Sequence, residues 1–297
     1  MKEKIGVSKP MPKITLVCDR VRWEEKAIID AAEKRGIAMS RVDAKSIYLD
    51  ALEESEVEKN LARVILQRCM SYFRGLYLTA LLEEHGKDVI NRFSVAETCG
   101  NKLLTSMTLS RAKIPTPKTK IAFTPETAME AISEIGYPAV LKPVVGSWGR
   151  HIVPLRNKDI AEAVFEDRQF MYPLYQIYYI QEMIERPPRD LRVVMVGDEI
   201  AASTYRYAAT DKWKTNIAAG GTAAPCPVTE ELEDLCSRAS QAVGGGILGI
   251  DLMESSRGLL VHEVNHTVEF KGAQSATKTS IASKIIDYAL SKVKELE

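Results

Sequence analysis

Gly249-Ile-Asp-Leu-Met253 and Val261-His-Glu-Val-Asn265 are the stretches that decide the fold, and a Ser-Ser-Arg-Gly turn lies between them. Side chains alternate between the two faces of a strand, so Glu263 and Asn265 share a face. Antiparallel pairing through the turn can bring Asp251 beside them. Two carboxylates and an amide oxygen suit the oxygen-rich coordination of Mg²⁺. Taken alone, a solvated sheet face with alternating polar residues explains the hairpin equally well.

Upstream, a lysine inside an apolar strand precedes a glycine-containing loop. Val140-Leu-Lys-Pro143 is followed by Gly146-Ser-Trp-Gly-Arg150, and Lys102 lies on an earlier predicted helix. A lysine in an apolar strand costs free energy unless it meets an anion. The backbone N–H groups of the loop, with its arginine, can cover phosphates. Taken singly, a turn explains the glycines and a solvated helix explains Lys102.

Between these pieces lie Tyr179-Ile-Gln-Glu-Met-Ile-Glu185 and Arg189-Asp-Leu-Arg-Val193. The first stretch ends an apolar strand at Gln181 and Glu182, where backbone groups can meet an adenine edge and apolar side chains can enclose its ring. Arginines at the start of the second stretch suit phosphate or carboxylate binding. Further cationic and amide groups follow in Tyr205-Arg-Tyr207 and in residues 214–221. A solvated surface is the alternative for each of these segments.

Strands and helices alternate in the first part of the chain, which predicts a small parallel α/β domain. No glycine-rich dinucleotide fingerprint follows the first strand, which argues against NAD binding. We expect a disordered tail at 1–12 and domains at 13–93, 94–180 and 181–297. The expected elements are strands at 13–18, 37–42, 63–67, 88–90, 118–123, 139–143, 177–182, 248–253 and 259–265, a hairpin at 191–204, and helices at 24–35, 75–84, 94–112, 125–135, 229–243 and from 276 onward.

The bulk composition excludes several classes of protein. Of 297 residues, 45% are hydrophobic and 27% charged, and the net charge is zero, so we expect no general affinity for nucleic acid or for anionic membranes. No apolar run approaches the ~20 residues that span a bilayer. The first dozen residues do not form a signal peptide. The five cysteines contain no CxxC pair, which favours free buried thiols in a cytoplasmic protein.

The order of these motifs from Lys102 to Asn265 resembles the ATP-grasp superfamily, and the resemblance covers nearly the whole chain. Glu263-Val-Asn-His-Thr-Val-Glu-Phe-Lys271, together with the Gly146 to Arg150 loop, is similar to the amino-group carrier protein ligases of lysine and arginine biosynthesis. These are related to the ligases that add glutamate to a ribosomal protein. The resemblance implies a fold of the α/β (α+β) class, with an N-terminal parallel pre-ATP-grasp domain, a central domain and a C-terminal domain.

The resemblance also implies roles for single residues, with ATP and two Mg²⁺ ions as the expected cofactors. The expected metal ligands are Asp251, Glu263 and Asn265, and the expected catalytic residues are Arg192, Asn216 and Lys142. The residues expected to bind ATP are Lys102, Lys142, Gly146, Ser147, Trp148, Gly149, Gln181, Glu182, Ile184 and Asp190. The residues expected to bind the other substrates are Arg206, Lys214, Asn216, Lys271, Gly272 and Ala273. For His266 both a structural and a catalytic role stay open.

The implied reaction begins with transfer of the γ-phosphoryl group to the C-terminal glutamate of a small acidic carrier protein of the LysW type. The resulting acyl phosphate is then attacked by the amine of α-aminoadipate or glutamate. The family pattern after Phe-Lys is Gly-Phe in glutamate-specific members and Asn-Thr in aminoadipate-specific members, whereas this chain has Gly272-Ala273. The small alanine leaves room for α-aminoadipate. One methylene in a pocket is worth only ~1–3 kcal/mol, so we expect that glutamate is used too.

Two other functions fit parts of the pattern. A ligase that glutamylates a ribosomal protein or a peptide would carry the same motifs. A non-catalytic nucleotide-binding module would keep the fold but is expected to lose a metal ligand, and Asp251, Glu263 and Asn265 are all present. Relatives of this kind make a homodimer or homotetramer the expected assembly.

Overall fold

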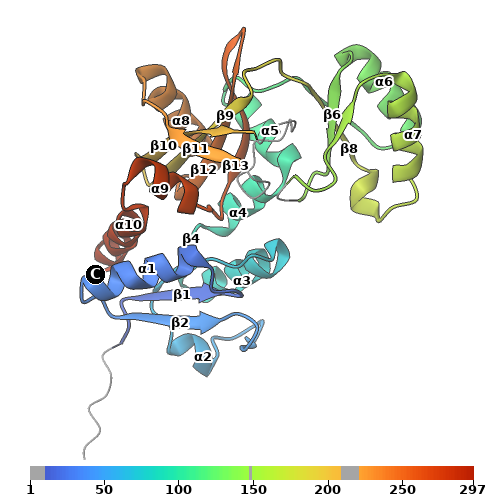
Figure 1. Cartoon of the computed structure of the whole chain (residues 1–297). Coiled ribbons are helices and arrows are strands. Elements are labelled where there is room, and N and C mark those ends of the chain that lie inside the picture. The colour runs from blue at the N-terminus through green and yellow to red at the C-terminus, as the bar shows by residue number, and fades with distance from the viewer. Residues whose placement is uncertain (1–10, 147–148, 209–220) are drawn as a thin grey trace, which may run out of the picture. The chain divides into compact units, whose positions relative to one another are not determined.

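The computed structural model describes residues 11–146, 149–208 and 221–297, and its chain divides into two compact units (Figure 1). One unit contains the residues up to Phe93 together with Ser280–Glu297, and the other contains Ser94–Thr279. The predicted tail at 1–12 lies almost wholly outside the described residues.

A four-stranded parallel sheet forms the centre of the first unit, with strand order β2-β1-β3-β4. Every residue of β1 and β3 is buried, as the apolar runs in their sequences predict. The helix α3 packs its Leu78 and Leu82 against Val17 and Ile65 of these strands. The elements of this unit are β1 (Ile14–Cys18), α1 (Trp23–Lys34), β2 (Met39–Asp43), α2 (Glu56–Lys59), β3 (Val64–Gln67), α3 (Tyr72–Glu84), β4 (Asp88–Ile90) and α10 (Ile281–Leu296).

The C-terminal helix α10 belongs to this N-terminal unit, although the sequence-based boundaries place it in the domain at 181–297. It contacts α1, β1 and β3, and Arg35 at the end of α1 forms an ion pair with Asp287. Its apolar face, which includes Ile285 and Ile286, is buried. The chain therefore returns at its end to complete the core with which it began.

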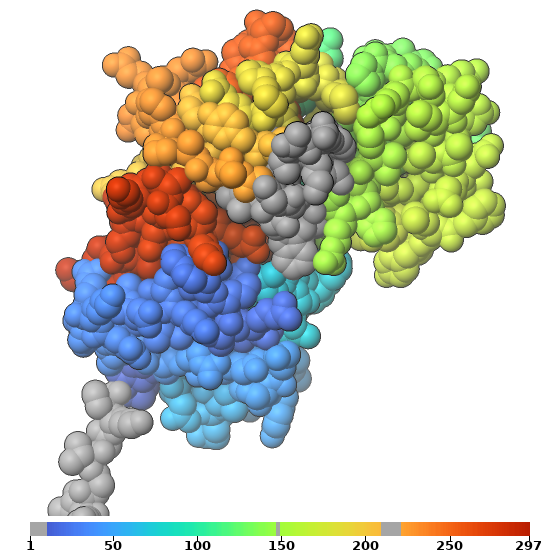
Figure 2. All heavy atoms as spheres, in the orientation of Figure 1, coloured from blue at the N-terminus to red at the C-terminus, as the bar shows by residue number. Residues whose placement is uncertain are grey.

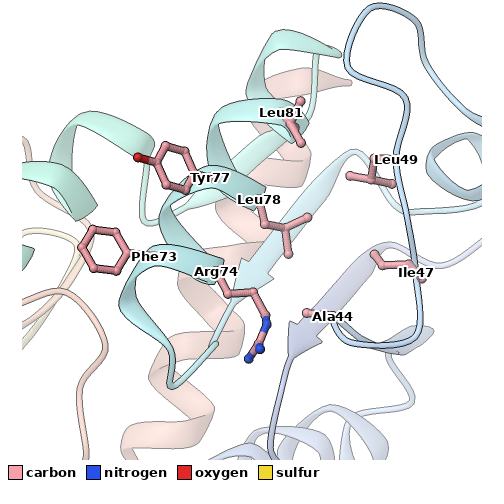
Figure 3. A pocket seen from close by; sticks show the side chains of 8 residues that line it. All are labelled: Ala44, Ile47, Leu49, Phe73, Arg74, Tyr77, Leu78 and Leu81. Carbon is pink, nitrogen blue, oxygen red and sulfur yellow. The ribbon is translucent and has the colours of Figure 1, made fainter.

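An apolar pocket of about 380 Å³ lies in the same unit, between α3 and the segment that follows β2 (Figure 3). Phe73 and Tyr77 stand at one side of it with stacked rings, and 52% and 63% of their surfaces are exposed. The cation Arg74 at its edge is paired with Asp19 at 2.6 Å. None of the predicted site residues lines this pocket.

The second unit begins with two helices and a four-stranded antiparallel sheet of order β5-β8-β6-β7. Helices α6 and α7 cover one face of that sheet, and the three elements form the green and yellow-green surface in Figure 2. Ile132 of α6 and Phe165 of α7 are fully buried between the helices and the strands. The elements of this layer are α4 (Phe93–Gly100), α5 (Lys102–Arg111), β5 (Thr119–Ala122), α6 (Pro125–Ile135), β6 (Ala139–Lys142), β7 (Val153–Leu155), α7 (Lys158–Arg168), the 3₁₀ helix η1 (Pro173–Gln176) and β8 (Tyr178–Glu182).

A five-stranded antiparallel sheet of order β11-β10-β9-β12-β13 completes the second unit. The amphipathic helix α8 packs Leu232, Leu235 and Ala239 against its strands, while α9 contacts β10 and β11. The central strands β9 and β12 carry predicted site residues. The elements are β9 (Arg189–Val196), β10 (Glu199–Tyr207), β11 (Thr222–Pro225), α8 (Glu230–Val243), β12 (Ile247–Ser255), β13 (Gly258–Asn265) and α9 (Lys271–Thr277).

Two predicted helices are each divided in the structure. The stretch 94–112 forms α4 and α5, because Asn101 leaves the helical conformation and caps α5 by accepting hydrogen bonds from Leu103 and Leu104 N–H. The stretch from 276 forms the end of α9 and then α10, with Lys278 between them at φ 57°. The split of the second unit at residue 180 stays a prediction.

All five cysteines are buried and free, as predicted. Within the described part of the chain, no helix is long and apolar enough to cross a membrane.

Candidate active site

The hairpin of β12 and β13 brings the three predicted metal ligands together. Asp251 faces Glu263 in register, and Gly249 faces Asn265. The Asn265 Nδ2 lies 3.4 Å from Asp251 Oδ2. Two carboxylates and an amide therefore meet on one face of this sheet, as alternation along the strands predicts.

A β-bulge interrupts this hairpin at the same place. The register shifts after Asp251, so that Leu252 pairs with Val261 and His262 is the extra residue on β13. Both ring nitrogens of His262 are buried and have no hydrogen-bond partner among the described residues. Burial and the charge of Lys142 lower the pKa of the ring to about 3, so it is neutral at pH 7. Bulges re-aim side chains beside active sites, and simple alternation along β13 gives no signal for this residue.

Two arginines surround Asp251 on the sheet face. Arg192 lies opposite it on β9 and donates from Nη2 to its Oδ2 at 2.9 Å, and the Nε of Arg192 forms an ion pair with Oδ1. Arg206 Nη2 lies 3.1 Å from the same Oδ1. Burial raises the pKa of Asp251, and the two guanidinium groups oppose that rise.

Arg206, which is predicted to bind a substrate, is already paired with two buried carboxylates of the protein. Its Nε and Nη2 donate to the two oxygens of Asp190 at 2.7 and 2.9 Å, and both residues are buried. Burial alone lowers the pKa of Arg206, but Asp251 and Asp190 raise it above its usual range. The structure therefore joins Asp190, which is predicted to bind ATP, to a buried network with Asp251.

Lys102 links helix α5 to the hairpin of β12 and β13. It is the first residue of α5, and its Nζ donates to Glu263 Oε1 at 3.2 Å and to the backbone oxygen of Gly146 at 3.0 Å. Burial alone raises the pKa of this glutamate, but the charges of Lys102 and Lys142 lower it to about 2. The first predicted phosphate lysine, the glycine loop and a predicted metal ligand thus meet at one point.

Lys142 ends strand β6 with a buried ammonium group. Its Nζ donates to Gln181 Oε1 at 2.6 Å, and the Gln181 amide in turn donates to Thr119 and to the hydroxyl of Tyr179. Burial lowers the pKa of Lys142 to about 8, and Lys102 adds to the lowering. A buried cation whose hydrogen-bond partner is a neutral amide suits the binding of an anion.

The residues predicted to line the adenine pocket lie at the end of β8. This strand runs between β5 and β6, so the backbone of Gln181 pairs within the sheet. Glu182 accepts from the backbone N–H of Lys118 at 2.7 Å and forms an ion pair with Arg257. Ile184 follows beyond the strand and is half-buried. Recognition of adenine by backbone groups would therefore involve the chain beyond Gln181, and it stays a prediction.

The remaining predicted residues are distributed around this sheet. Gly149 is half-buried beside its loop, and His266 is half-buried after β13. Lys271 is exposed at the start of α9, Gly272 is half-buried, and Ala273 has only 4% of its surface exposed. Ser147, Trp148, Lys214 and Asn216 lie outside the described residues.

The donor set of the hairpin fits Mg²⁺. Elsewhere in the described chain no three His, Cys, Asp or Glu side chains gather as a metal centre, and the hairpin itself offers only two carboxylates. Mg²⁺ in nucleotide sites is commonly held by one or two carboxylates and completed by phosphate oxygens and water. Asp251, Glu263 and Asn265 are therefore a suitable set for a nucleotide-bound metal.

Comparison with known families decides where the chain belongs. The LysX preATP-grasp domain matches residues 14–98, and the RimK-like ATP-grasp domain matches residues 99–289. The chain belongs to the RimK-like ATP-grasp family. The ATP-grasp fold and the family resemblance predicted from the sequence are thereby confirmed.

Full-length relatives of this RimK-like ATP-grasp protein are named as ligases. It is 37% identical to the alpha-aminoadipate–LysW ligase LysX of Saccharolobus solfataricus, over 92% of this chain and 99% of the relative. It is 33% identical to the glutamate–LysW ligase ArgX of Sulfurisphaera tokodaii, over 93% of this chain and 97% of the relative. The crystal structure of a RimK domain ATP-grasp protein from Sphaerobacter thermophilus matches with a TM-score of 0.76 and 26% identity, over 93% of this chain and 98% of that one.

Proposed function

We propose that this protein is an ATP-dependent LysW ligase of lysine and arginine biosynthesis. It joins the α-amino group of α-aminoadipate, and of glutamate, to the γ-carboxylate of the C-terminal glutamate of the carrier protein, through an acyl phosphate. The observation that carries the proposal is the 37% identity to a LysX over 99% of that relative's length. The geometry of Lys102, Lys142 and the hairpin supports it.

The phosphate end of the site follows from the positions of two cations. Lys102 lies between Glu263 and the loop carbonyl of Gly146, and Lys142 lies buried beside a neutral amide. Both ammonium groups can turn to the α- and β-phosphates of ATP, whose charged oxygens accept charge-assisted hydrogen bonds. The loop at 146–149 would then cover the triphosphate.

The metal ligands would lie where negative charge accumulates. Asp251, Glu263 and Asn265 would hold Mg²⁺, expected as two ions, which would neutralise phosphate charge and polarise the γ-phosphoryl group. The low pKa of Glu263, about 2, keeps its carboxylate ionised and ready to act as a ligand at any physiological pH.

Arg192 is the residue best placed to stabilise the transferring group. It lies opposite Asp251 in the register of the sheet and donates to the carboxylate of this predicted metal ligand at 2.9 Å. Phosphoryl transfer depends on positioning and electrostatic stabilisation, with little covalent chemistry for the protein to perform. We assign Asn216, by the family resemblance, to the same task on the acyl phosphate.

The amino-acid specificity would be set near Gly272 and Ala273. Ala273 is buried in α9, a helix that contacts β10 and β11. A small side chain here leaves space that a phenylalanine would fill, which supports acceptance of α-aminoadipate as well as glutamate. Lys271, at the exposed end of α9, stays a candidate for binding a substrate carboxylate.

The partner of the reaction would be a small acidic carrier protein. We expect no nucleic-acid partner, because acidic and basic residues balance at forty each. A cytoplasmic location and a homodimer or homotetramer also stay predictions.

An assay with separate substrates tests the proposal. The purified protein is mixed with ATP, Mg²⁺ and a LysW-type carrier, and α-aminoadipate or glutamate is added one at a time. We expect carrier-dependent release of phosphate and a carrier mass increased by one amino-acid residue. Phosphate release that does not depend on the carrier, or a product formed only on a ribosomal protein or a free peptide, would refute the assignment.

A further inference from the structure

Gly249 lies in β12, at a position where the backbone conformation does not require glycine. It lies two residues before Asp251, so both residues face the same side of the sheet. It is not among the glycines with a positive φ, so its conformation is accessible to other residues. Glycine weakens a strand interior, and it often marks a place where another group approaches the backbone closely.

The group that approaches is the guanidinium of Arg192. A Cβ atom built on Gly249 would lie 2.6 Å from Arg192 Nη1 and 3.5 Å from its Cζ. The next neighbour, Val268 Cγ1, would lie 3.3 Å away, which is a tight contact that a small shift relieves. A side chain at position 249 would therefore occupy the space that the guanidinium of Arg192 now fills.

The position of Arg192 depends on that space. Its Nη2 donates to Asp251 Oδ2, its Nε forms an ion pair with Oδ1, and its Nη1 lies next to Gly249. We propose that Gly249 is a positioning residue for phosphoryl transfer, because its missing side chain lets the Arg192 guanidinium lie flat beside Asp251. This inference rests on the proposed function, in which Arg192 stabilises the transferring group.

The clash is with the far end of a flexible side chain, so an added methyl group displaces the guanidinium and leaves the backbone in place. The fold should therefore tolerate Gly249→Ala, while Arg192 loses its alignment with Asp251. Misplacing a catalytic group by about 1 Å can lower a rate by about a hundredfold.

Gly75 provides a matched control. A Cβ atom on Gly75 would also meet the end of a flexible side chain, Gln67 Nε2, at 2.5 Å. Gly75 lies in α3 of the other compact unit, which contains none of the predicted site residues. Gly75→Ala therefore reproduces the kind of clash without touching Arg192.

The test is a double-mutant cycle of Gly249→Ala and Arg192→Lys, with kcat, the KM for ATP and the melting temperature measured for each variant. We expect Gly249→Ala to lower kcat by about a hundredfold, with the KM for ATP and the melting temperature close to those of Gly75→Ala. In the Arg192→Lys background the same glycine change should have little further effect, because lysine has no planar group over residue 249.

Wild-type kcat in Gly249→Ala would overturn the proposal, as would an equal loss of kcat in both backgrounds. Restoration by Val268→Ala would also overturn it, because the valine and not the arginine would then be the obstructed group. Binding of a non-hydrolysable ATP analogue with Mg²⁺ is measured for the same variants. It distinguishes a wrong role for Gly249 from a wrong assignment of the carrier substrate. If wild-type protein binds the analogue but ligates no carrier, the proposed function fails, and the cycle is then read from kcat for the release of phosphate from ATP without carrier.

Discussion

The charge on Lys142 should control how tightly the free enzyme binds ATP as pH changes. Burial lowers its pKa to about 8, and the charged form is the one that pairs with phosphate. The affinity should therefore be constant below pH 8 and weaken by about tenfold per pH unit above it, until the higher pKa of the bound lysine is reached. Calorimetric titration with a non-hydrolysable ATP analogue between pH 6.5 and 9.5 measures this profile.

Lys142→Met is the control for that profile, because methionine keeps the length of the side chain without a charge. Its affinity should be lower by about 10- to 100-fold at pH 7, as expected for a lost charge-assisted hydrogen bond. It should also be flat across the same pH range. A pH profile in the variant that matches the wild type would assign the titration to another group.

Arg206 should contribute more to stability than to substrate binding. Removing it leaves the buried Asp190 without its two hydrogen bonds. Arg206→Gln should therefore lower the free energy of unfolding by about 3–5 kcal/mol, as measured by urea denaturation. Arg238→Gln on α8 is the control, because its pair with Asp234 is exposed and should change stability by less than about 0.5 kcal/mol. Unchanged stability with a raised KM for the amino acid would instead support direct substrate binding by Arg206.

Part of the candidate site can be predicted from single residues. Alternation along two strands is enough to predict that Asp251, Glu263 and Asn265 lie on one face. The presence of a charged residue in an apolar strand is enough to single out Lys142. The pairing of Arg206 with Asp190 depends on the register between β9 and β10, which one sequence does not specify. The position of His262 depends on a bulge, which breaks the alternation on which the prediction rests.

At the scale of elements, the C-terminal helix should stabilise the N-terminal sheet. Ile285 of α10 is 1% exposed, and the helix contacts β1 and β3. Ile285→Ala should lower the free energy of unfolding by about 2–5 kcal/mol, because it leaves a cavity in a core. Hydrogen exchange should accelerate in β1 and β3 and stay unchanged in β9 and β12.

Lys294→Ala on the same helix is the matched control, because this residue is exposed and its loss should change stability by less than about 0.5 kcal/mol. If Ile285→Ala instead accelerated exchange in β9 and β12, the helix would belong with the sheet that carries the site, as the sequence-based boundaries place it.

Helices were predictable where their ends carry a strong signal. Thr124 before Pro125 and Thr229 before Glu230 cap α6 and α8, each by accepting a backbone N–H. The break at Asn101 gives no signal in the spacing of apolar residues, because its neighbours on both sides have helical spacing. Only the side-chain cap to Leu103 and Leu104 marks the new start. Strand β7, with three residues, is too short to give a periodic pattern.

At the scale of the whole molecule, the order of weak motifs carried the prediction of the fold. Lys102, Lys142 and Glu263 lie far apart in the chain, yet the two lysines come from different elements to act on the same carboxylate. A solvated helix or a solvated sheet face can explain such residues singly, and no periodicity in the sequence predicts that they lie close together. The packing of α10 on β1 is equally non-local, and it was not predicted.

The last prediction concerns the choice between two substrates that differ by one methylene. With α-aminoadipate and glutamate at equal concentration, wild-type protein should use both, with a preference below about 100-fold, because one methylene is worth only ~1–3 kcal/mol. Mass spectrometry of the carrier resolves the two products. Gly272→Asn combined with Ala273→Thr should raise the share of α-aminoadipate, since the family resemblance implies this pair in aminoadipate-specific members. A wild-type preference above about 100-fold would contradict dual use, and an unchanged product ratio in the double variant would place specificity outside α9.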